Sequence, residues 1–470
     1  MKKSTLIRML IVLVISTTIL AACGEEATKA PAATQAPSGE FDWQQLKGQK
    51  ITVFLSETPM ASAIRNHLQE FEDKTGIDVE YLVVAETQYW NKLSVDLASG
   101  AGEFNVFMSG PSISWGFATA KQIQPLDPFI NDPTLTPPEF DFADFYQWAI
   151  DANRWNGEYG FGGQGKGSLW SMPIDQVNNL LTYRKDLFDQ YGLKPPDTWE
   201  EWASVAKQLM EKTGGTVDGK PFYAVIQRGA LDGTTMSGPL NSMLDSYLVQ
   251  DFDENLNPQF STPKAVEVFK LYMDTIKDYG TPEWPNQVWF DVQQAFASGQ
   301  YGMVFDVGDF IPTYEKNLAG KLAYVQPPAG PDGTRRSSVW TWGFSMNSQT
   351  TGDKAKAAWL FIAWASGQGP MKDFAASGSW PTRKSVWNDP QVVAQTTAYG
   401  NGTFRTAFDA VLNNDQVRWT VTPIPETAGV YLDVVKALQD YYFGKGDMET
   451  LMAAVDAKAI EAMKASGTLK

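Results

Sequence analysis

Strand-like and helix-like segments alternate from residue 50 onward, and this alternation limits the possible folds more than any other feature of the sequence. Buried-strand patterns lie at 50–55, 78–84 and 105–108, and apolar side chains recur at helical spacing at 64–71 and 89–98. Strand–helix–strand units of this kind predict an α/β fold built on a mostly parallel sheet.

The loops that follow the first and third predicted strands are the first candidate binding elements. On parallel sheets, small molecules bind in crevices at the carboxyl ends of strands. Glu57 lies in the first of these loops, at 56–58, and Ser109 opens the other, at 109–111. We therefore expect both residues to lie near a bound molecule.

Helix signals continue through the second half of the chain. Thr198 and Glu201 form a capping-box pattern at the start of one helix, and Pro263 occupies the first turn of another. Residues 355–365 and 432–442 also have helical patterns. No tandem repeat is found, which argues against solenoid and propeller folds.

The N-terminal residues have the pattern of a bacterial secretory signal. Lys2, Lys3 and Arg8 precede an apolar run at 9–20 that is too short to span a bilayer. Residues 1–22 are therefore predicted to be a signal peptide, removed just before Cys23. This cysteine is the only one in the chain, and its position resembles a lipobox, in which the thiol carries the lipid, such as palmitate. An ordinary cleavage site with an unmodified thiol is the alternative.

The mature chain is predicted to be acidic and globular. Loss of residues 1–22 leaves 448 residues and changes the formal charge from −16 to −19. This charge disfavours nucleic acids and, more mildly, anionic ligands. A hydrophobic content of 43% supports large cores, and the length predicts about two to three domains. Residues 23–45 begin with a run rich in Ala, Pro and Thr, and they are predicted to form a flexible tether.

Short motifs then occur in a distinctive order over nearly the whole mature chain. They are Gln122-Ile123-Gln124-Pro125-Leu126-Asp127, Met172-Pro173-Ile174-Asp175, Gly192-Leu193-Lys194-Pro195-Pro196-Asp197-Thr198-Trp199, Ala295-Phe296-Ala297-Ser298-Gly299, Trp342-Gly343-Phe344 and Trp380-Pro381-Thr382-Arg383. In this order and spacing the chain resembles the extracellular solute-binding proteins of carbohydrate ABC importers, a family of type II periplasmic-binding-protein-like folds.

The resemblance implies two α/β lobes joined by a hinge, which close around a solute. Lobe 1 is expected to comprise 46–160 and about 340–385, and lobe 2 about 161–339 and about 386–470. The implied function is the capture of a neutral carbohydrate or sugar alcohol for ABC permease subunits, by a monomer anchored through Cys23 to the outer face of the cell membrane. No enzymatic activity, cofactor or metal is expected.

The resemblance and the chemistry of hydroxylated ligands together select candidate ligand-binding residues. Such a ligand needs flat aromatic walls, together with carboxylates, amides and guanidinium groups. Trp340 and Trp342 rank first, because they lie two apart before Gly343, on one face of a strand; packing in the hinge is their alternative role. The other candidates are Glu57, Gln88, Trp90, Ser109, Trp115, Asp175, Arg228, Asp306, Asp309 and Arg383.

Two of these assignments stay open. The family more often places an aromatic residue shortly after the strand that ends at Asp306, whereas this chain has Val307-Gly308-Asp309, so Asp306 and Asp309 are alternatives. Arg383 has two possible roles, which are donation to ligand hydroxyls and pairing with a carboxylate at the hinge.

Two motif matches are discounted. Residues 160–165 match a dinucleotide-binding pattern and, with Lys166, nearly a P-loop, but Gly167 stands where Ser or Thr is needed and no strand–helix context surrounds them. Residues 251–255 begin like a calcium loop but lack the Gly and Glu that follow in such loops.

Catalysis has few candidate residues. His67 is the only histidine and lies on a helix flank, so triads and His-rich zinc sites are excluded. A glycoside-active enzyme needs only two carboxyl groups and remains an alternative. A receptor for a peptide or other solute on the same fold is a further alternative.

Overall fold

The structure is a computed structural model that describes residues 40–231, 236–419 and 421–469. The predicted signal peptide, Cys23 and residues 23–39 of the predicted tether lie outside these described residues. Residues 40–470 belong to one compact unit. No helix among the described residues is both long enough and apolar enough to span a membrane.

The predicted strand–helix–strand units are present at the start of this unit. β1 (Lys50–Ser56) pairs in parallel with β2 (Asp78–Val84) and with β3 (Val106–Ser109). Between these strands lie α2 (Pro59–Thr75) and α3 (Glu86–Ser99), as the sequence predicted. The side chain of Thr58 caps α2 by accepting a hydrogen bond from an N–H of its first turn, which fixes where the helix begins.

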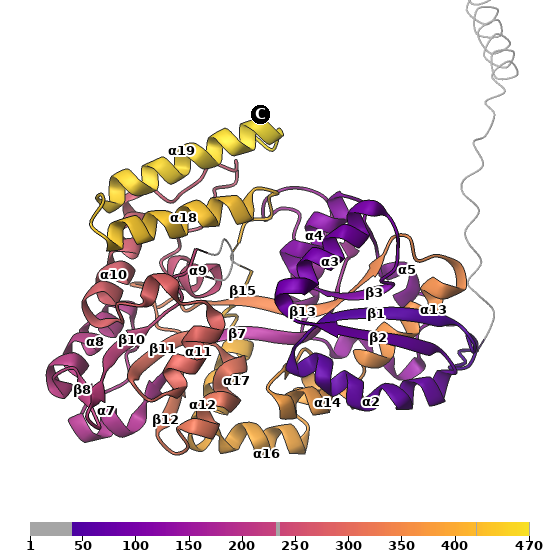
Figure 1. The fold of residues 1–470 in the computed structure, drawn as a ribbon, viewed down its shortest axis with the longest axis horizontal. Coiled ribbons are helices and arrows are strands. Elements are labelled where there is room, and N and C mark those ends of the chain that lie inside the picture. The colour runs from indigo at the N-terminus through magenta and orange to yellow at the C-terminus, as the bar shows by residue number, and fades with distance from the viewer. Residues whose placement is uncertain (1–39, 232–235, 420, 470) are drawn as a thin grey trace, which may run out of the picture. The chain divides into compact units, whose positions relative to one another are not determined.

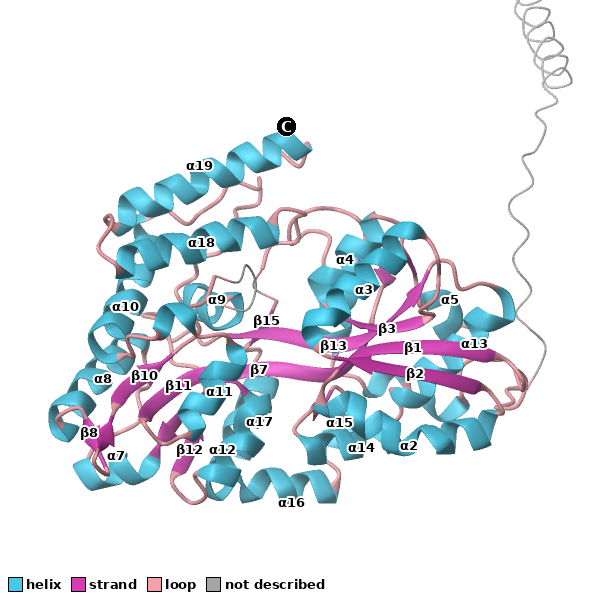
Figure 2. Cartoon of the chain, viewed as in Figure 1, coloured by secondary structure: helices cyan, strands magenta, loops and turns pink. Residues whose placement is uncertain are grey.

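Two long strands join the two halves of the sheet, which we call the first and second lobes. β7 (Met172–Arg184) pairs with β13 (Ser337–Asn347) through its first half and with strands of the second lobe through its second half. β13 continues into the first lobe, where it pairs with β3. All 13 residues of β7 are buried, and Figures 1 and 2 show both strands running between the two groups of elements.

The resulting sheet is less parallel than predicted. In the described residues it contains eleven strands, seven of which follow the order β10-β11-β7-β13-β3-β1-β2, where β10 is Tyr223–Ile226 and β11 is Tyr301–Val307. The pairs β1–β2 and β10–β11 are parallel, whereas β7 pairs with β11 and with β13, and β13 pairs with β3, in the antiparallel direction. The reason is that β7 and β13 carry the chain between the lobes in opposite directions.

The second lobe surrounds β10 (Tyr223–Ile226), β11 (Tyr301–Val307) and β12 (Leu322–Val325). Its helices include α8 (Trp199–Thr213), which begins at the predicted Thr198 cap, and α10 (Pro263–Tyr279). The remaining elements of this lobe are α7 (Lys185–Tyr191), α9 (Ser237–Ser246), α11 (Trp289–Ala297), α12 (Ile311–Asn317), α17 (Thr403–Asn413), α18 (Thr427–Tyr442) and α19 (Met448–Ser466).

The first lobe is completed by segments from later in the chain. α13 (Gly352–Ala365) packs on β1, and α14 (Gln368–Ser377) packs on α2. The short strand β14 (Trp380–Pro381) then pairs with β7, and β15 (Val417–Arg418) pairs with the start of β13. α16 (Pro390–Ala398) packs between α14 and α17.

Two sets of contacts lie near the expected boundaries. β5 (Arg154–Trp155) pairs with β6 (Ser168–Leu169), and Leu126 donates a backbone hydrogen bond to Leu169, so residues 154–169 contact the segment that precedes them. The described end of the predicted tether is also folded. Phe41 and Trp43 pack against the core of the first lobe, and Leu46 is buried.

Candidate functional site

The candidate site lies where β7 and β13 pair, on the face that carries Trp340 and Trp342. Trp342 lies opposite Asp175 in the register of these strands, and Trp340 lies opposite Val177. Directly opposed residues of an antiparallel pair present their side chains to the same face of the sheet. The two indole rings and the Asp175 carboxyl group therefore share one face between the lobes.

The tryptophans of this face belong to a continuous row of aromatic rings. The Trp342 ring centroid lies 6.4 Å from that of Trp90 and 5.2 Å from that of Trp340. Trp340 lies 5.7 Å from Trp419, which lies 5.2 Å from Trp115. The row brings together four predicted residues and one, Trp419, that the sequence did not select.

The members of this row differ in exposure. Trp90, Trp340 and Trp342 are half-buried, whereas Trp115 is only 4% exposed. Trp115 also contacts Trp155, with the ring centroids 6.4 Å apart. The three half-buried rings therefore offer faces to a ligand, whereas Trp115 supports the row by packing.

Two carboxyl groups near this row, those of Asp175 and Asp309, each have one oxygen without a hydrogen-bond partner. Burial raises the pKa of Asp175 well above its ordinary value, although the Trp380 and Gln176 backbone N–H groups and the Ser379 hydroxyl donate to it. One oxygen of Asp175 and one of Asp309 are buried without a hydrogen-bond partner. A buried polar atom without a partner is costly, and a ligand hydroxyl would remove that cost.

Asp309 is electrostatically linked to the same site. Burial is the main cause that raises the pKa of Asp309 well above its ordinary value, and the charge of Asp175 raises it further. Arg228 acts in the opposite direction. A carboxyl group that keeps its proton can both donate and accept hydrogen bonds, which matches the chemistry of a hydroxyl group.

Asp306 has a different environment from Asp309. Both of its oxygens accept hydrogen bonds from Arg228, at 2.9 Å from Nε and 2.5 Å from Nη2, and the Val307 backbone N–H also donates to it at 2.7 Å. Asp306 is 4% exposed and Arg228 is 9% exposed. Of the two alternatives left by the sequence, Asp309 therefore has the free oxygen, and Asp306 holds Arg228 in place.

Glu57 and Gln88 are exposed and lie at the ends of first-lobe elements. Glu57 directly follows β1, and its backbone N–H donates to Val84 at the end of β2. Gln88 lies in the first turn of α3, two residues before Trp90. Both lie on the lobe that carries Trp90, and both are far more exposed than the buried Asp175.

Two predicted ligand contacts are engaged inside the first lobe instead. The Ser109 hydroxyl is fully buried and bonds to the hydroxyls of Ser171 and Ser345, at 3.1 and 2.6 Å. Its side chain therefore has a structural role, because it points into the sheet packing rather than into the loop.

Arg383 is also turned into the first lobe. It is fully buried and donates to the carbonyls of Ser366, Phe140 and Asp141, as well as to the Asp144 carboxylate. Its guanidinium group lies 4.0 Å from the Phe145 ring centroid. These contacts correspond to the second of its two predicted roles, which is pairing with a carboxylate.

The segments of the two discounted motifs, and His67, make structural contacts. Residues 160–165 form turns, and the Gly160 N–H donates to the Pro423 carbonyl, 2.9 Å away. The Asp251 carboxylate accepts from the Thr422 N–H and the Tyr431 hydroxyl. His67 bonds to Glu70 and Asp373. No group of three His, Cys, Asp or Glu side chains spaced for a metal ion occurs in the described part of the chain.

Comparison with protein families gives a match over most of the chain. The model of the bacterial extracellular solute-binding proteins matches residues 56–372. An erythritol/L-threitol-binding protein of Mycolicibacterium smegmatis is 29% identical over 445 residues, covering 92% of this chain and 90% of the relative. A mannitol-binding protein of Pseudomonas aeruginosa is 22% identical over 419 residues, covering 84% of this chain and 88% of the relative.

Solved structures share the two-lobed fold. An ABC transporter solute-binding protein of Agrobacterium radiobacter in complex with ribitol superimposes with a TM-score of 0.74 at 20% identity, covering 89% of this chain and 99% of that one. A solute-binding protein of Agrobacterium vitis with bound D-mannitol gives 0.71 at 20% identity, covering 89% and 99%. The predicted two-lobed α/β architecture is thereby confirmed.

Proposed function

Because the chain belongs to the family of bacterial extracellular solute-binding proteins, we propose that it captures a neutral sugar alcohol or sugar and delivers it to an ABC importer. The family consists of binding proteins rather than enzymes. Membership therefore argues against the glycoside-active alternative, and the protein acts outside the cytoplasm.

The observation that carries the proposal is the position of Trp342 opposite Asp175 across β7 and β13. The apolar C–H face of a polyol packs on an indole ring, while its hydroxyls need groups that donate and accept. The free oxygens of Asp175 and Asp309 supply that capacity beside the rings. The acidic composition of the chain favours a neutral solute over an anion.

Relatives support the choice of ligand class. The names of the two curated relatives specify erythritol, L-threitol and mannitol, and the two structural neighbours hold ribitol and D-mannitol. All are acyclic sugar alcohols. We therefore rank four- to six-carbon polyols ahead of oligosaccharides, although maltose and larger glycans occur in other neighbours of this fold.

The proposed mechanism is closure of two lobes around the solute. Trp342 and Asp175 lie on the strands that join the lobes, Trp90 belongs to the first lobe and Asp309 follows β11 of the second. A ligand that touches all of them favours the closed state through contacts that the open state lacks. In this proposal lobe 1 contains β1–β3, α13 and α14, and lobe 2 contains β10–β12 and the helices around them.

Thermal unfolding with a polyol panel tests the function. Erythritol, L-threitol, ribitol and D-mannitol are each added to the purified protein, with a tripeptide as the alternative solute. At least one polyol is expected to raise the midpoint by several degrees, because a ligand at about 100 times its Kd stabilises the folded state by about 2.7 kcal/mol. A shift with the peptide and none with any polyol would contradict the proposal.

We also propose that Cys23 carries the lipid anchor and that residues 24–39 space the folded body from the membrane. The support is the apolar run before Leu20-Ala21-Ala22-Cys23 and the lack of any other cysteine. The permease subunits of the importer are then reached at the outer face of the membrane by a monomeric binding protein.

Replacement of the thiol tests the anchor. Cys23→Ser is expected to remove acylation and to release most of the protein from the membrane fraction, because the described residues contain no helix that could span a membrane. The measurement is metabolic labelling with a palmitate analogue together with cell fractionation. Equal membrane retention of both forms, with no label in either, would contradict the proposal.

A further inference from the structure

A pocket lies on the side of β13 that carries Val339, and it adjoins the aromatic row of the candidate site through Trp419. Val339 lines it, and Val339 alternates along the strand with Trp340 and Trp342, whose side chains point to the opposite face. The pocket has a volume of about 730 Å³, which lies within the range of small-molecule sites. Neither Asp175 nor Trp342 lines it.

Both lobes contribute to this pocket. Trp148 and Asp151 come from α6 (Gln147–Asn153), which packs against β13 on the side of the first lobe. Asp245 and Leu248 come from the end of α9 and the residue segment after it, in the second lobe. Leu248 is 58% exposed and forms part of the rim.

The pocket has aromatic walls with unused hydrogen-bond donors. Trp148 and Trp419 both line it, and the indole nitrogen of each is buried without a hydrogen-bond partner. Trp419 is only 8% exposed, so its N–H group has little access to water as a hydrogen-bond acceptor. A buried donor without an acceptor carries a penalty of about 1–3 kcal/mol, which a bound acceptor would relieve.

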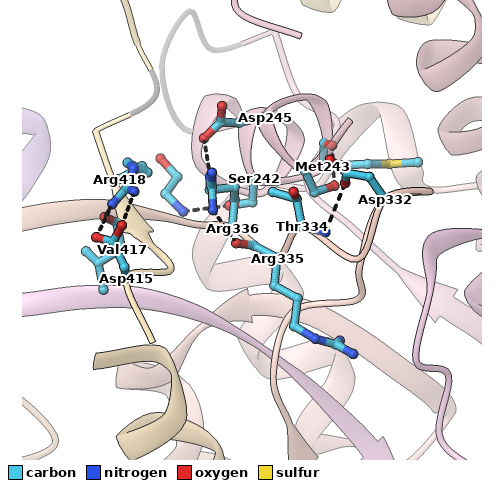
Figure 3. A network of polar contacts seen from close by, with 12 residues as sticks. Ser242, Met243, Asp245, Asp332, Thr334, Arg335, Arg336, Asp415, Val417 and Arg418 are labelled. Carbon is cyan, nitrogen blue, oxygen red and sulfur yellow. Dashed lines mark hydrogen bonds and ion pairs between the residues drawn. The ribbon is translucent and has the colours of Figure 1, made fainter. Parts of the chain in front are cut away.

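The charged groups of the pocket are largely balanced in pairs. Figure 3 shows Arg336 directed toward Asp245 and Arg418 toward Asp415, with nitrogen–oxygen distances of 3.2 and 2.6 Å. Each cation thus has a carboxylate partner, and Asp151 and Asp253 add further negative charge to the lining. This arrangement disfavours an anion and suits a neutral molecule with many hydroxyl groups.

The shape of the lining distinguishes a ring from an open chain. Trp148, Phe161 and Trp419 present flat apolar surfaces, and the amide groups of Gln164, Gln250 and Gln259 lie among the same lining residues. Flat aromatic faces match the C–H faces of a pyranose ring, and amides together with Arg–Asp pairs match ring hydroxyls. The volume exceeds that needed by a four- to six-carbon polyol.

We propose that this pocket is a second binding site, which takes a neutral cyclic sugar of one or two rings. It differs from the polyol site in its lining, because it contains neither Trp342 nor Asp175, and Trp419 is the one member of the aromatic row that lines it. Its occupancy does not depend on the proposed function of the polyol site, and either proposal can fail without the other.

Calorimetric titration of D-glucose and maltose tests the second site. The titrations use the Trp342→Ala protein, in which the polyol site is impaired, and one sugar is expected to bind with a stoichiometry of one. Adding Trp148→Phe to this background keeps the aromatic wall but removes one buried donor, and it is expected to weaken that binding about tenfold.

The matched control is Trp202→Phe in the same background. The Trp202 indole nitrogen is also buried without a hydrogen-bond partner, but this ring lies in the core of the second lobe and does not line the pocket. Its replacement is expected to leave the sugar affinity unchanged.

Three outcomes would overturn the second site. They are the absence of binding by both sugars, an equal loss in the Trp148→Phe and Trp202→Phe proteins, and sugar binding that disappears with Trp342→Ala alone. The single variant Trp148→Phe also tests whether the sugar site and the polyol site are independent. It is expected to keep the polyol-induced thermal shift of the unmodified protein.

Discussion

The Trp342→Ala protein is expected to lose the polyol-induced rise in unfolding temperature and to bind the polyol about 10- to 100-fold more weakly. Trp342 supplies the half-buried ring that lies opposite Asp175, so its removal takes away the apolar wall of the proposed site. An aromatic contact with a ligand face accounts for about 1–3 kcal/mol of binding on this reasoning. Calorimetry at a fixed temperature measures the affinity directly.

Two further variants make this result specific. Trp342→Phe keeps a flat ring and is expected to retain most of the affinity. Trp43→Ala removes an indole of similar burial that contacts Phe41 edge-on and lies under the Lys74 ammonium group at the start of the first lobe, and it is expected to leave polyol binding unchanged. An unaltered Kd in the Trp342→Ala protein would exclude the stacking role.

Arg383→Met is expected to lower the free energy of unfolding by about 3–5 kcal/mol, the usual cost of breaking a buried charge network from one side. The methionine leaves three carbonyl groups and the Asp144 carboxylate without the donors that Arg383 provides. It also removes the cation from the Phe145 ring. Urea denaturation followed by tryptophan fluorescence measures the change.

Ligand affinity separates the two roles predicted for Arg383. Because its donors are all used inside the first lobe, the folded Arg383→Met protein is expected to bind the polyol with a Kd within about twofold of the original, a change of less than about 0.5 kcal/mol. Arg418→Met serves as the control for stability. Arg418 pairs with the exposed Asp415, and such surface pairs contribute about 0–1 kcal/mol. A large loss of affinity with unchanged stability would restore Arg383 as a ligand contact.

Local signals in the sequence were sufficient to predict the elements of each lobe. The Thr198 cap and Pro263 mark helix starts that the structure contains, because both act through the few residues around them. The antiparallel pairing of β7 with β13 was not predicted. It depends on residues more than 150 positions apart, and neither segment contains a local pattern that identifies the strand with which it pairs.

The candidate site was predictable only in part, for a related reason. Trp342 and Asp175 could be selected by chemistry and motif, and their register then places them together. The direction of the Ser109 hydroxyl could not be predicted, because it is set by Ser171 and Ser345, which come from distant parts of the chain.

Trp419 is a residue of the candidate site that the sequence did not select. It follows a two-residue strand and has no motif around it, so its sequence context resembles that of many buried tryptophans. Its importance arises from its contacts with Trp340 and Trp115, and these depend on the pairing of β15 with β13. The alternation of apolar and polar residues at 416–419 was the signal available in the sequence.

The repeated passage of the chain between the lobes also has a consequence for biosynthesis. The first lobe cannot complete its part of the sheet until β13 has emerged, by which point the central strands of the second lobe have already been synthesised. Neither lobe can therefore mature as a finished unit at the exit of the ribosome. This order also means that no single cut in the gene yields two fragments that each encode a whole lobe.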